Sequence, residues 1–325
     1  MIKKSLHRQL FVLGFSGLFV FGAGLAAAQS YPSKPIRWIV PFQPGGTTDI
    51  IARLVGQKLS EAWGQQVVID NRPGASAMIG TELGAKAAPD GYTLMFAYNG
   101  NMTMNPNLFR KLPYDPIKDF TPVSLIAGTP MVLVVHPAVP AKTLQEFIAQ
   151  AKAQPGKINL AVGGGVGQLS GELFKSMAKV DLFNVPYKGN APSLAAVLAG
   201  EASVMFETTN AALPHIKAGK LRALAVTSAK RSSVLADIPS IGEVVPGYDV
   251  SVWFGVSVPT GTPKDIINKI STEIARIVKA PDVKERLAAQ GLEVVGSTPE
   301  QLAAIIKPEL DTWARVVKEA NIPVE

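Results

Sequence analysis

The stretch PIRWIVPFQPGGTTDIIARLVGQKLSEAW, residues 35–63, decides how this chain folds. The apolar run 36–42 is rich in β-branched and aromatic residues and predicts a buried strand. A Pro-Gly-Gly turn at 44–46 ends that run, and apolar residues then recur at helical spacing, which predicts a helix that begins near Thr47. A strand, a glycine turn and a helix N-terminus together point several main-chain N–H groups at one place, which is typical of an anion site. An ordinary strand-to-helix turn is the alternative, because glycine turns are common.

The first 28 residues have the pattern of a signal peptide. Three basic residues precede an almost uniformly apolar run, 10–25, and Ala26-Ala27-Ala28 supplies the small residues of a cleavage site. We expect export to the periplasm, with cleavage after Ala28. A retained membrane anchor is the alternative, although the apolar run is short for a spanning helix. No Cys follows the run, which excludes a lipid anchor, and no later segment reaches 18 apolar residues.

The composition is that of a globular protein with a substantial core. The chain has 325 residues, enough for two domains, with 47% hydrophobic and 18% charged residues. It contains no Cys, which excludes disulfides, thiolate metal sites and Cys nucleophiles. The net charge of +7 is mild, and the basic residues are spread along the chain without interleaved aromatic residues, so we expect no nucleic-acid partner.

Strands and helices alternate after the opening stretch, which predicts an α/β fold with a mainly parallel sheet flanked by helices. We expect further strands at 66–70, 92–98, 123–127, 131–135, 158–162, 183–186, 202–206, 221–227 and 250–258. We expect further helices at 78–88, 144–153, 168–178, 192–199, 264–279, 282–290 and 299–320. Residues 105–122 are Pro-rich and predict an irregular surface connection. The chain is expected to cross between two lobes near 123–135 and to return near 250–258.

A second strand–glycine loop–helix unit lies in the second half of the chain, with GGGVG at 163–167. Ligands of open α/β sheets bind beyond the carboxyl ends of the strands. Two such ends that face each other predict a ligand cleft between the lobes. An anion-binding loop is one interpretation of 163–170, and a flexible loop is the other.

No catalytic or metal-binding motif is complete. His136 and His215 are isolated from other ligand types, so we expect no metal site. No glycine run completes the hydrolase pattern G-x-S-x-G, the end of the phosphate-binding P-loop, G-K-[ST], or the dinucleotide-binding pattern G-x-G-x-x-G. We therefore expect neither an enzyme nor a cofactor.

Four side chains at strand ends are candidates for the cleft, each with an alternative. Tyr187 and Lys188 could supply a stacking face and a cation, or form an exposed turn. Glu207 could face the cleft or end a strand in solvent. Tyr98 stands near a strand end, where an aromatic residue more often belongs to the core.

Six segments in a fixed order carry a family resemblance: YPSKPIRWIVPFQPGGTTDIIAR at 31–53, GQQVVIDNRPGA at 64–75, PDGYTL at 89–94, VPYKG at 185–189, GKLRALAVTSAKRS at 219–232 and VWFGVSVPTGTP at 252–263. Together they span essentially the whole chain after the signal peptide. The set resembles the tripartite tricarboxylate transporter substrate-binding family, also called Bug or TctC-like receptors.

The resemblance implies a type II periplasmic-binding-protein fold, with two α/β lobes around a ligand cleft and a two-crossing hinge. It implies that the first glycine loop holds a ligand carboxylate, largely through main-chain groups and ordered water. This places at the site Phe42, Gly45, Gly46, Thr47, Thr48 and Asp49. From the second lobe it adds Gly163, Gly164, Gln168, Tyr187 and Lys188.

Three departures from the family pattern leave the ligand open. Ser76-Ala77-Met78 replaces a glycine-rich stretch, Tyr98 stands where a small residue is commoner, and Glu207 replaces an expected Asp. The last two flank the end of the cleft that would set specificity.

The signal-peptide pattern, the two expected crossings and the resemblance together predict a signal peptide at 1–28, a first lobe of 29–128 with 254–325, and a second lobe of 129–253. It implies a monomeric periplasmic receptor that delivers a small mono- or dicarboxylate, aromatic acid or amino acid to the permease subunits of a tripartite tricarboxylate transporter. Two alternatives stay open. One is a secreted hydrolase of a small amide or ester in the same cleft, and the other is a ligand sensor for a two-component system.

Overall fold

The computed structural model describes residues 31–163 and 165–324. The predicted signal peptide with its cleavage site after Ala28, and Gly164 of the second glycine loop, lie outside these residues. The strands are β1 (Ile36–Val40), β2 (Val67–Asn71), β3 (Thr93–Tyr98), β4 (Phe120–Val135), β5 (Asn159–Val162), β6 (Phe183–Pro186), β7 (Val204–Thr208), β8 (Arg222–Val226), β9 (Ser251–Pro259) and β10 (Glu293–Val294). The helices are α1 (Thr47–Trp63), α2 (Met78–Ala85), η1 (Gly100–Met104, a π-helix), α3 (Asn105–Leu108), α4 (Leu144–Ala153), α5 (Gly165–Ala178), α6 (Asn190–Leu198), α7 (Thr209–Lys217), η2 (Ile241–Glu243, a 3-10 helix), α8 (Lys264–Val278), α9 (Pro281–Ala289) and α10 (Pro299–Glu319).

The opening stretch folds as its pattern predicts. β1 is a buried strand, and the ring of Trp38 stacks on Phe96 of β3 with centroids 6.0 Å apart. α1 begins at Thr47, buries its apolar face, and ends at Gly64 with a φ of 64°. That left-handed cap favours glycine, which explains why the helix stops there.

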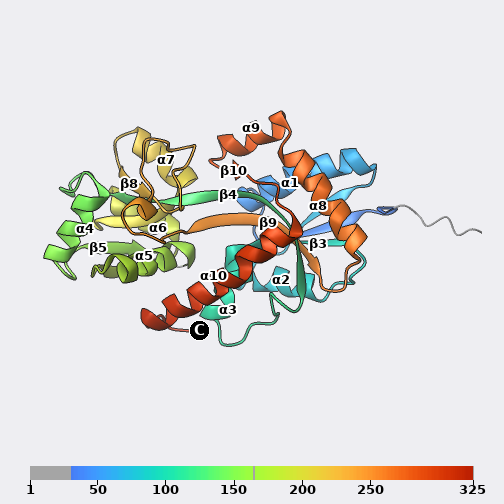
Figure 1. Ribbon diagram of the computed structural model, residues 1–325, viewed down its shortest axis with the longest axis horizontal. Coiled ribbons are helices and arrows are strands. Elements are labelled where there is room, and N and C mark those ends of the chain that lie inside the picture. Colours follow the sequence, from blue (N-terminus) through green and yellow to red (C-terminus); the bar gives the residue numbers. More distant parts are fainter. Residues whose placement is uncertain (1–30, 164, 325) are drawn as a thin grey trace, which may run out of the picture.

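The strands form one continuous sheet in the order β2-β1-β3-β9-β4-β7-β5-β6, and β8 and β10 also pair with β4. β1 pairs in parallel with β2 and β3, and β5 pairs in parallel with β6 and β7. The carboxyl ends of each parallel group therefore meet at one edge. Figure 1 shows two lobes, with α1, α2, α8 and α9 around the first group and α4, α5, α6 and α7 around the second. We call these lobe 1 and lobe 2.

β4 and β9 are the crossings between the lobes, as the sequence predicts (Figure 1). The expected break in the first crossing is wrong, because β4 is one strand of 16 residues. Its residues 120–130 pair with β9, which supplies partners opposite Gly128, Thr129 and Pro130. Residues 131–135 pair instead with β7 and β8. The strand thus changes partners between Pro130 and Met131 without ending.

Several short elements were not predicted from the sequence. Residues 105–122, expected to be irregular, begin with α3, and the turn before them is the π-helix η1. β10 has two residues and pairs with β4. α7 follows β7 directly and contains Pro214, a residue that disfavours the interior of a helix.

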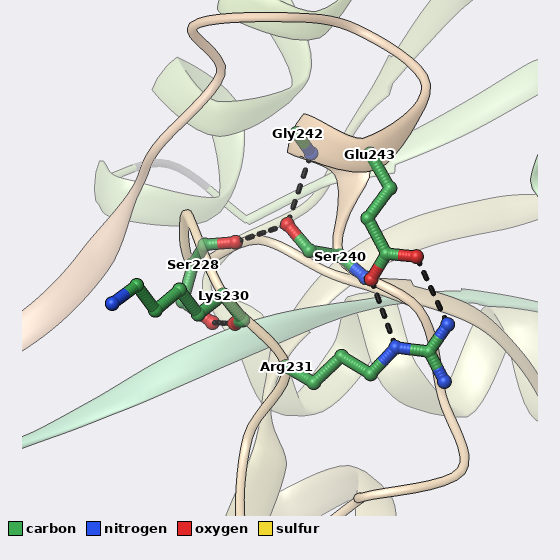
Figure 2. Close-up of polar contacts among 6 residues, drawn as sticks. All are labelled: Ser228, Lys230, Arg231, Ser240, Gly242 and Glu243. Carbon is green, nitrogen blue, oxygen red and sulfur yellow. Dashed lines mark hydrogen bonds and ion pairs between the residues drawn. The ribbon is translucent and has the colours of Figure 1, made fainter.

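The connection from β8 to β9 is held by polar contacts (Figure 2). Arg231 donates from Nε and Nη2 to the two carboxylate oxygens of Glu243, each at 2.9 Å. Glu243 also accepts the main-chain N–H of Ser240, and the Ser240 hydroxyl accepts that of Gly242. The hydrogen bond from Arg231 is the main reason that the pKa of Glu243 is lowered to about 2. This closed loop fixes where the chain enters the hinge strand β9.

Candidate functional site

The first glycine loop leaves its main chain open to a ligand. Gly45 has a φ of 90°, and Gly46 is the N-cap of α1 in an extended conformation, without a side-chain cap. A Cβ built on either glycine would meet no atom within 4 Å. The N–H of Ile50 bonds to the carbonyl of Gly46, so the N–H groups of the first helical turn lie at the open end of α1. Helix N-termini of this kind favour anions.

Asp49 holds this loop in place. Its carboxylate accepts the N–H of Gly45 at 2.9 Å, Nε of Arg53 at 2.8 Å and Nδ2 of Asn71 at 3.0 Å. Asn71 also donates to the carbonyl of Phe42 at 3.1 Å. Burial alone would raise the pKa of Asp49, but the hydrogen bonds from Arg53, Gly45 and Asn71 outweigh it and hold the pKa below its ordinary value. The carboxylate is therefore ionised and occupied by the loop itself.

Phe42 and Tyr98 form an aromatic pair beside the loop. They follow β1 and end β3, which are parallel neighbours, so the pairing of the strands brings the two rings together. The ring centroids lie 4.9 Å apart at an angle of 67°, an edge-to-face contact. Burial raises the pKa of the Tyr98 phenol. The pair therefore places two aromatic rings in contact at the strand ends of lobe 1.

The turn after β3 is fixed by buried amides. The N–H of Tyr98 donates to Oδ1 of Asn101, whose Nδ2 lies 3.1 Å from the Thr81 hydroxyl. Asn99 donates to the carbonyl of Ser251 at the start of β9, at 3.2 Å. This turn is the π-helix η1, a geometry found frequently at functional sites. It also contacts α5 of lobe 2, so the two lobes touch at this point.

The second glycine loop packs against the loop after β6. A Cβ on Gly163 would lie 2.5 Å from the carbonyl carbon of Gly189 and 2.7 Å from the N atom of Asn190. A Cβ on Gly167, at the start of α5, would lie 2.9 Å from the carbonyl oxygen of Phe206 in β7. These close approaches require glycine. They bring the ends of β5, β6 and β7 together.

Glu207 is a buried carboxylate at the end of β7. Only 2% of its surface is exposed, and Oε1 accepts the N–H and the hydroxyl of Thr208 at 2.6 and 3.0 Å. Burial raises its pKa, although hydrogen bonds from Thr208 and Asn190 act in the opposite direction. The solvated strand end considered as an alternative is therefore wrong for Glu207.

Three other predicted residues of lobe 2 are half-buried or exposed. Tyr187 is half-buried against the lobe-2 core, and its N–H bonds to the carbonyl of Val162 at 2.8 Å. Lys188 is exposed, and Gln168 is half-buried on the first turns of α5. Gly164 lies outside the described residues, so its place in the loop stays a prediction.

The twelve predicted residues that the structure describes thus fall into two groups, one at the strand ends of each lobe. Sequence reasoning missed the residues that hold these groups together, Asn71, Arg53 and Asn190. Asn71 belongs to the quoted segment 64–75, and Asn190 directly follows the segment 185–189. Their role depends on contacts with Asp49 and Gly163, which no spacing rule reveals.

Within the described residues, no group of three or more His, Asp or Glu side chains is placed to hold a metal ion. None of the helices there has both the length and the apolar character needed to cross a membrane.

A separate cavity of about 530 Å³ lies on the flank of the hinge, between α10, β4, β9 and the end of α5. Its wall includes Trp253, Trp313, Asp249, Glu293, Glu309 and Arg315. None of the predicted ligand residues lines it. It is therefore distinct from the strand ends that carry those residues.

A family model described as "Tripartite tricarboxylate transporter family receptor" matches residues 51–322. Among curated proteins, BugT of Bordetella pertussis is 38% identical over 317 residues, which cover 95% of this chain and 97% of BugT.

Two solved structures share both fold and sequence with the chain. An R. palustris protein determined with adipate has a TM-score of 0.76 at 38% identity, covering 90% of this chain and 99% of that one. MatC from Rhodopseudomonas palustris with bound malate has a TM-score of 0.72 at 33% identity, covering 88% and 100%.

Proposed function

The chain belongs to the tripartite tricarboxylate transporter receptor family, and from that premise we propose that it binds a small organic carboxylate between its lobes and delivers it to the permease of such a transporter. The family consists of periplasmic solute-binding receptors, which fixes the general function. The ligand class, the partner and the residues at the site are the proposal.

The observation that carries this proposal is the open main chain at Gly45 and Gly46. The loop stands at the N-terminus of α1, and a Cβ at either position would meet open space. A carboxylate could accept N–H groups there without displacing a side chain, and the helix dipole favours its negative charge. The Asp49 carboxylate does not occupy this position itself, because its oxygens already accept hydrogen bonds from Gly45, Arg53 and Asn71. We assign Asp49 the role of holding the loop.

The remaining groups would enclose the rest of the ligand. The pair Phe42 and Tyr98 offers an apolar wall in lobe 1. In lobe 2, Gly163 and Gln168 lie on the second glycine loop and the start of α5, with Tyr187, Lys188 and the buried Glu207 around them. The relatives determined with adipate and malate support a small carboxylic acid as the ligand class.

We propose that the first lobe consists of residues 29–128 and 254–325 and the second lobe of residues 129–253, because β4 changes its pairing partners between Pro130 and Met131.

We further propose that the leader is cleaved after Ala28 and that the mature protein acts as a monomer without enzymatic activity. Its proposed partners are permease subunits. Delivery to a permease distinguishes this proposal from a sensor of a two-component system.

A thermal-shift panel tests the ligand class. Adipate, malate, aspartate and benzoate would be compared with adipamide, which has the length of adipate without its charges. We expect a rise in melting temperature with at least one carboxylate and none with adipamide; saturation at a hundredfold excess over Kd corresponds to about 2.7 kcal/mol. An equal response to adipamide, or the appearance of hydrolysis products during incubation, would contradict the proposal.

A further inference from the structure

Glu309 is a half-buried carboxylate in the wall of the hinge-flank cavity, outside the proposed ligand site. It lies on α10, which runs from lobe 1 across the hinge towards lobe 2 (Figure 1). Both carboxylate oxygens lie 3.0 Å from Nε1 of Trp253 on the hinge strand β9. Oε2 also lies 2.8 Å from the hydroxyl of Thr103 in η1. The Glu309 side chain therefore links its own helix α10 to the hinge strand β9 and to η1, the turn after β3.

The hydrogen-bond count around Glu309 favours its acid form. The Thr103 hydroxyl lies 2.8 Å from the carbonyl of Asn99 as well as 2.8 Å from Glu309. A hydroxyl has one proton to donate, so it cannot donate to both acceptors. A proton on Glu309 resolves the conflict, because Glu309 then donates to Thr103 while Thr103 donates to Asn99. Trp253 donates to the carboxyl group in either form.

The charges in the cavity also favour the protonated form of Glu309. No Lys or Arg within residues 31–163 and 165–324 forms an ion pair with Glu309. Asp249 and Glu293 share the cavity wall with it, and Arg315 is the basic residue of that wall. Burial, with a smaller contribution from Asp249, raises the pKa of Glu309 to about 7, against hydrogen bonds from Trp253 and Thr103.

We propose that Glu309 is a positioning residue of the receptor, which as a carboxylic acid joins α10 to the hinge strand β9 and to the turn beside Tyr98. The inference deepens the proposed function and rests on it for the link to ligand binding. Loss of the proton breaks the chain Glu309–Thr103–Asn99 and places a second negative charge in the cavity wall that holds Asp249. The turn that follows Tyr98 and the crossing of the lobes then loosen together.

Two further contacts connect this joint to the lobes. Asn99 donates to Ser251, the first residue of β9, so the turn and the hinge strand are bonded directly. At its far end α10 reaches lobe 2, where Glu319 accepts a hydrogen bond from Ser176 of α5 at 3.0 Å. α10 therefore contacts both lobes on this side of the hinge.

The test compares melting temperatures of ligand-free Glu309→Gln, Glu309→Leu and the wild type from pH 5 to pH 8.5. Gln is neutral, donates to Thr103 and accepts from Trp253, so it reproduces the acid form at every pH. Because the folded pKa of Glu309 lies above its unfolded value, the contribution of Glu309 to wild-type stability falls as pH rises from about 4.5 through 7 and then levels. We expect wild type and Glu309→Gln to agree near pH 5 and to separate by roughly 5 °C above pH 8. Glu309→Leu should melt lower than Glu309→Gln throughout.

Asp311→Asn is the control, since it removes a carboxylate from the exposed side of the same helix; its curve should parallel that of the wild type. A constant gap between wild type and Glu309→Gln at all pH values, or a Glu309→Gln protein as unstable as Glu309→Leu, would overturn the proposal. With adipate as the probe, we expect the wild-type affinity to fall several-fold above pH 7 and that of Glu309→Gln to stay level. The absence of an effect from all four acids of the panel (adipate, malate, aspartate and benzoate) at any pH would contradict the proposed function, whereas the ligand-free curves would still decide the role of Glu309.

Discussion

The carboxylate of Asp49 accepts a hydrogen bond from the main-chain N–H of Gly45 at 2.9 Å, so the first acidic residue of α1 folds the glycine loop back onto its own helix. Arg53 and Asn71 complete the set of donors to the same carboxylate. The loop is therefore ordered before a ligand arrives. A ligand that binds a preorganised loop loses less free energy to ordering it.

Removing the Asp49 carboxylate should loosen this loop. In Asp49→Ala, Gly45 loses its acceptor and Arg53 loses its ion pair, so we expect carboxylate affinity to fall roughly tenfold or more, in line with the loss of one or two charge-assisted hydrogen bonds. Glu61→Ala, at the exposed end of the same helix, is the matched control and should bind normally. Isothermal calorimetry measures both. Equal affinities of the two variants would contradict a role for Asp49 in the site.

The same carboxylate predicts a pH dependence of stability. The folded pKa of Asp49 lies below its ordinary value of 3.8, so its contribution to the free energy of unfolding is present above pH 3.8 and is lost as pH falls through the folded pKa. The stability difference between wild type and Asp49→Asn should therefore shrink below about pH 4. Urea unfolding at pH 3 and pH 6 measures it. A difference that grows on acidification would show that Asp49 is not ionised in the folded protein.

Gly163 should not tolerate even one methyl group. In Gly163→Ala the new Cβ would lie 2.5 Å from the Gly189 carbonyl carbon, so one of the two loops must move. We expect a lower melting temperature, by several degrees, and weaker ligand binding, because core overpacking typically costs about 1–3 kcal/mol. Gly46→Ala is the control for melting, since its Cβ meets open space. Similar melting temperatures of the two variants would mean that the lobe-2 loops are not in close contact.

Tyr98 should act through its ring more than its hydroxyl. Tyr98→Phe keeps the edge-to-face contact with Phe42, so its melting temperature and affinity should stay near those of the wild type. Tyr98→Ala removes the ring from the wall, and we expect a loss of about 3 kcal/mol in the free energy of unfolding, as for other large aromatic truncations. Denaturant unfolding and calorimetry distinguish the two. If Tyr98→Phe loses binding as strongly as Tyr98→Ala, the hydroxyl contacts the ligand.

Ligand binding should draw the lobes together, because the chain crosses between them twice, in β4 and β9, and paired crossings make a hinge. Small-angle scattering should show a smaller radius of gyration with a saturating carboxylate from the thermal-shift panel. An unchanged radius, with binding confirmed by calorimetry, would indicate a rigid cleft.

The sequence predicts the elements well where pattern and turn chemistry agree. Residues 35–63 combine an apolar strand, a Pro-Gly-Gly turn and an amphipathic helix, and each is found where it is expected. The prediction of elements fails where pairing with a strand that is distant in the sequence decides the structure. Gly128 and Pro130 are poor strand formers, yet β4 continues through them because β9 pairs with each of them.

The site is predicted unevenly for the same reason. The open glycine loop follows from its sequence, but the function of Asp49 within it depends on Asn71, which lies one strand away. Glu309 shows no pattern at all in the sequence. Its environment is made by Thr103 and Trp253, which are distant in the chain and meet only when α10 packs over the hinge.

The central claim is that the main chain of the first glycine loop binds the ligand carboxylate, and calorimetry of Gly46→Val tests it most directly. Gly46 has a φ of −82°, which valine can adopt, and its Cβ would point into open space, so the ligand-free melting temperature should barely change. The side chain would fill the approach to the loop, and loss of two charge-assisted hydrogen bonds would weaken binding by roughly two to four orders of magnitude. Lys188→Ala, at an exposed position in lobe 2, should weaken binding less. Normal binding by Gly46→Val together with lost binding by Lys188→Ala would contradict the account and would assign the carboxylate to the side chains of lobe 2.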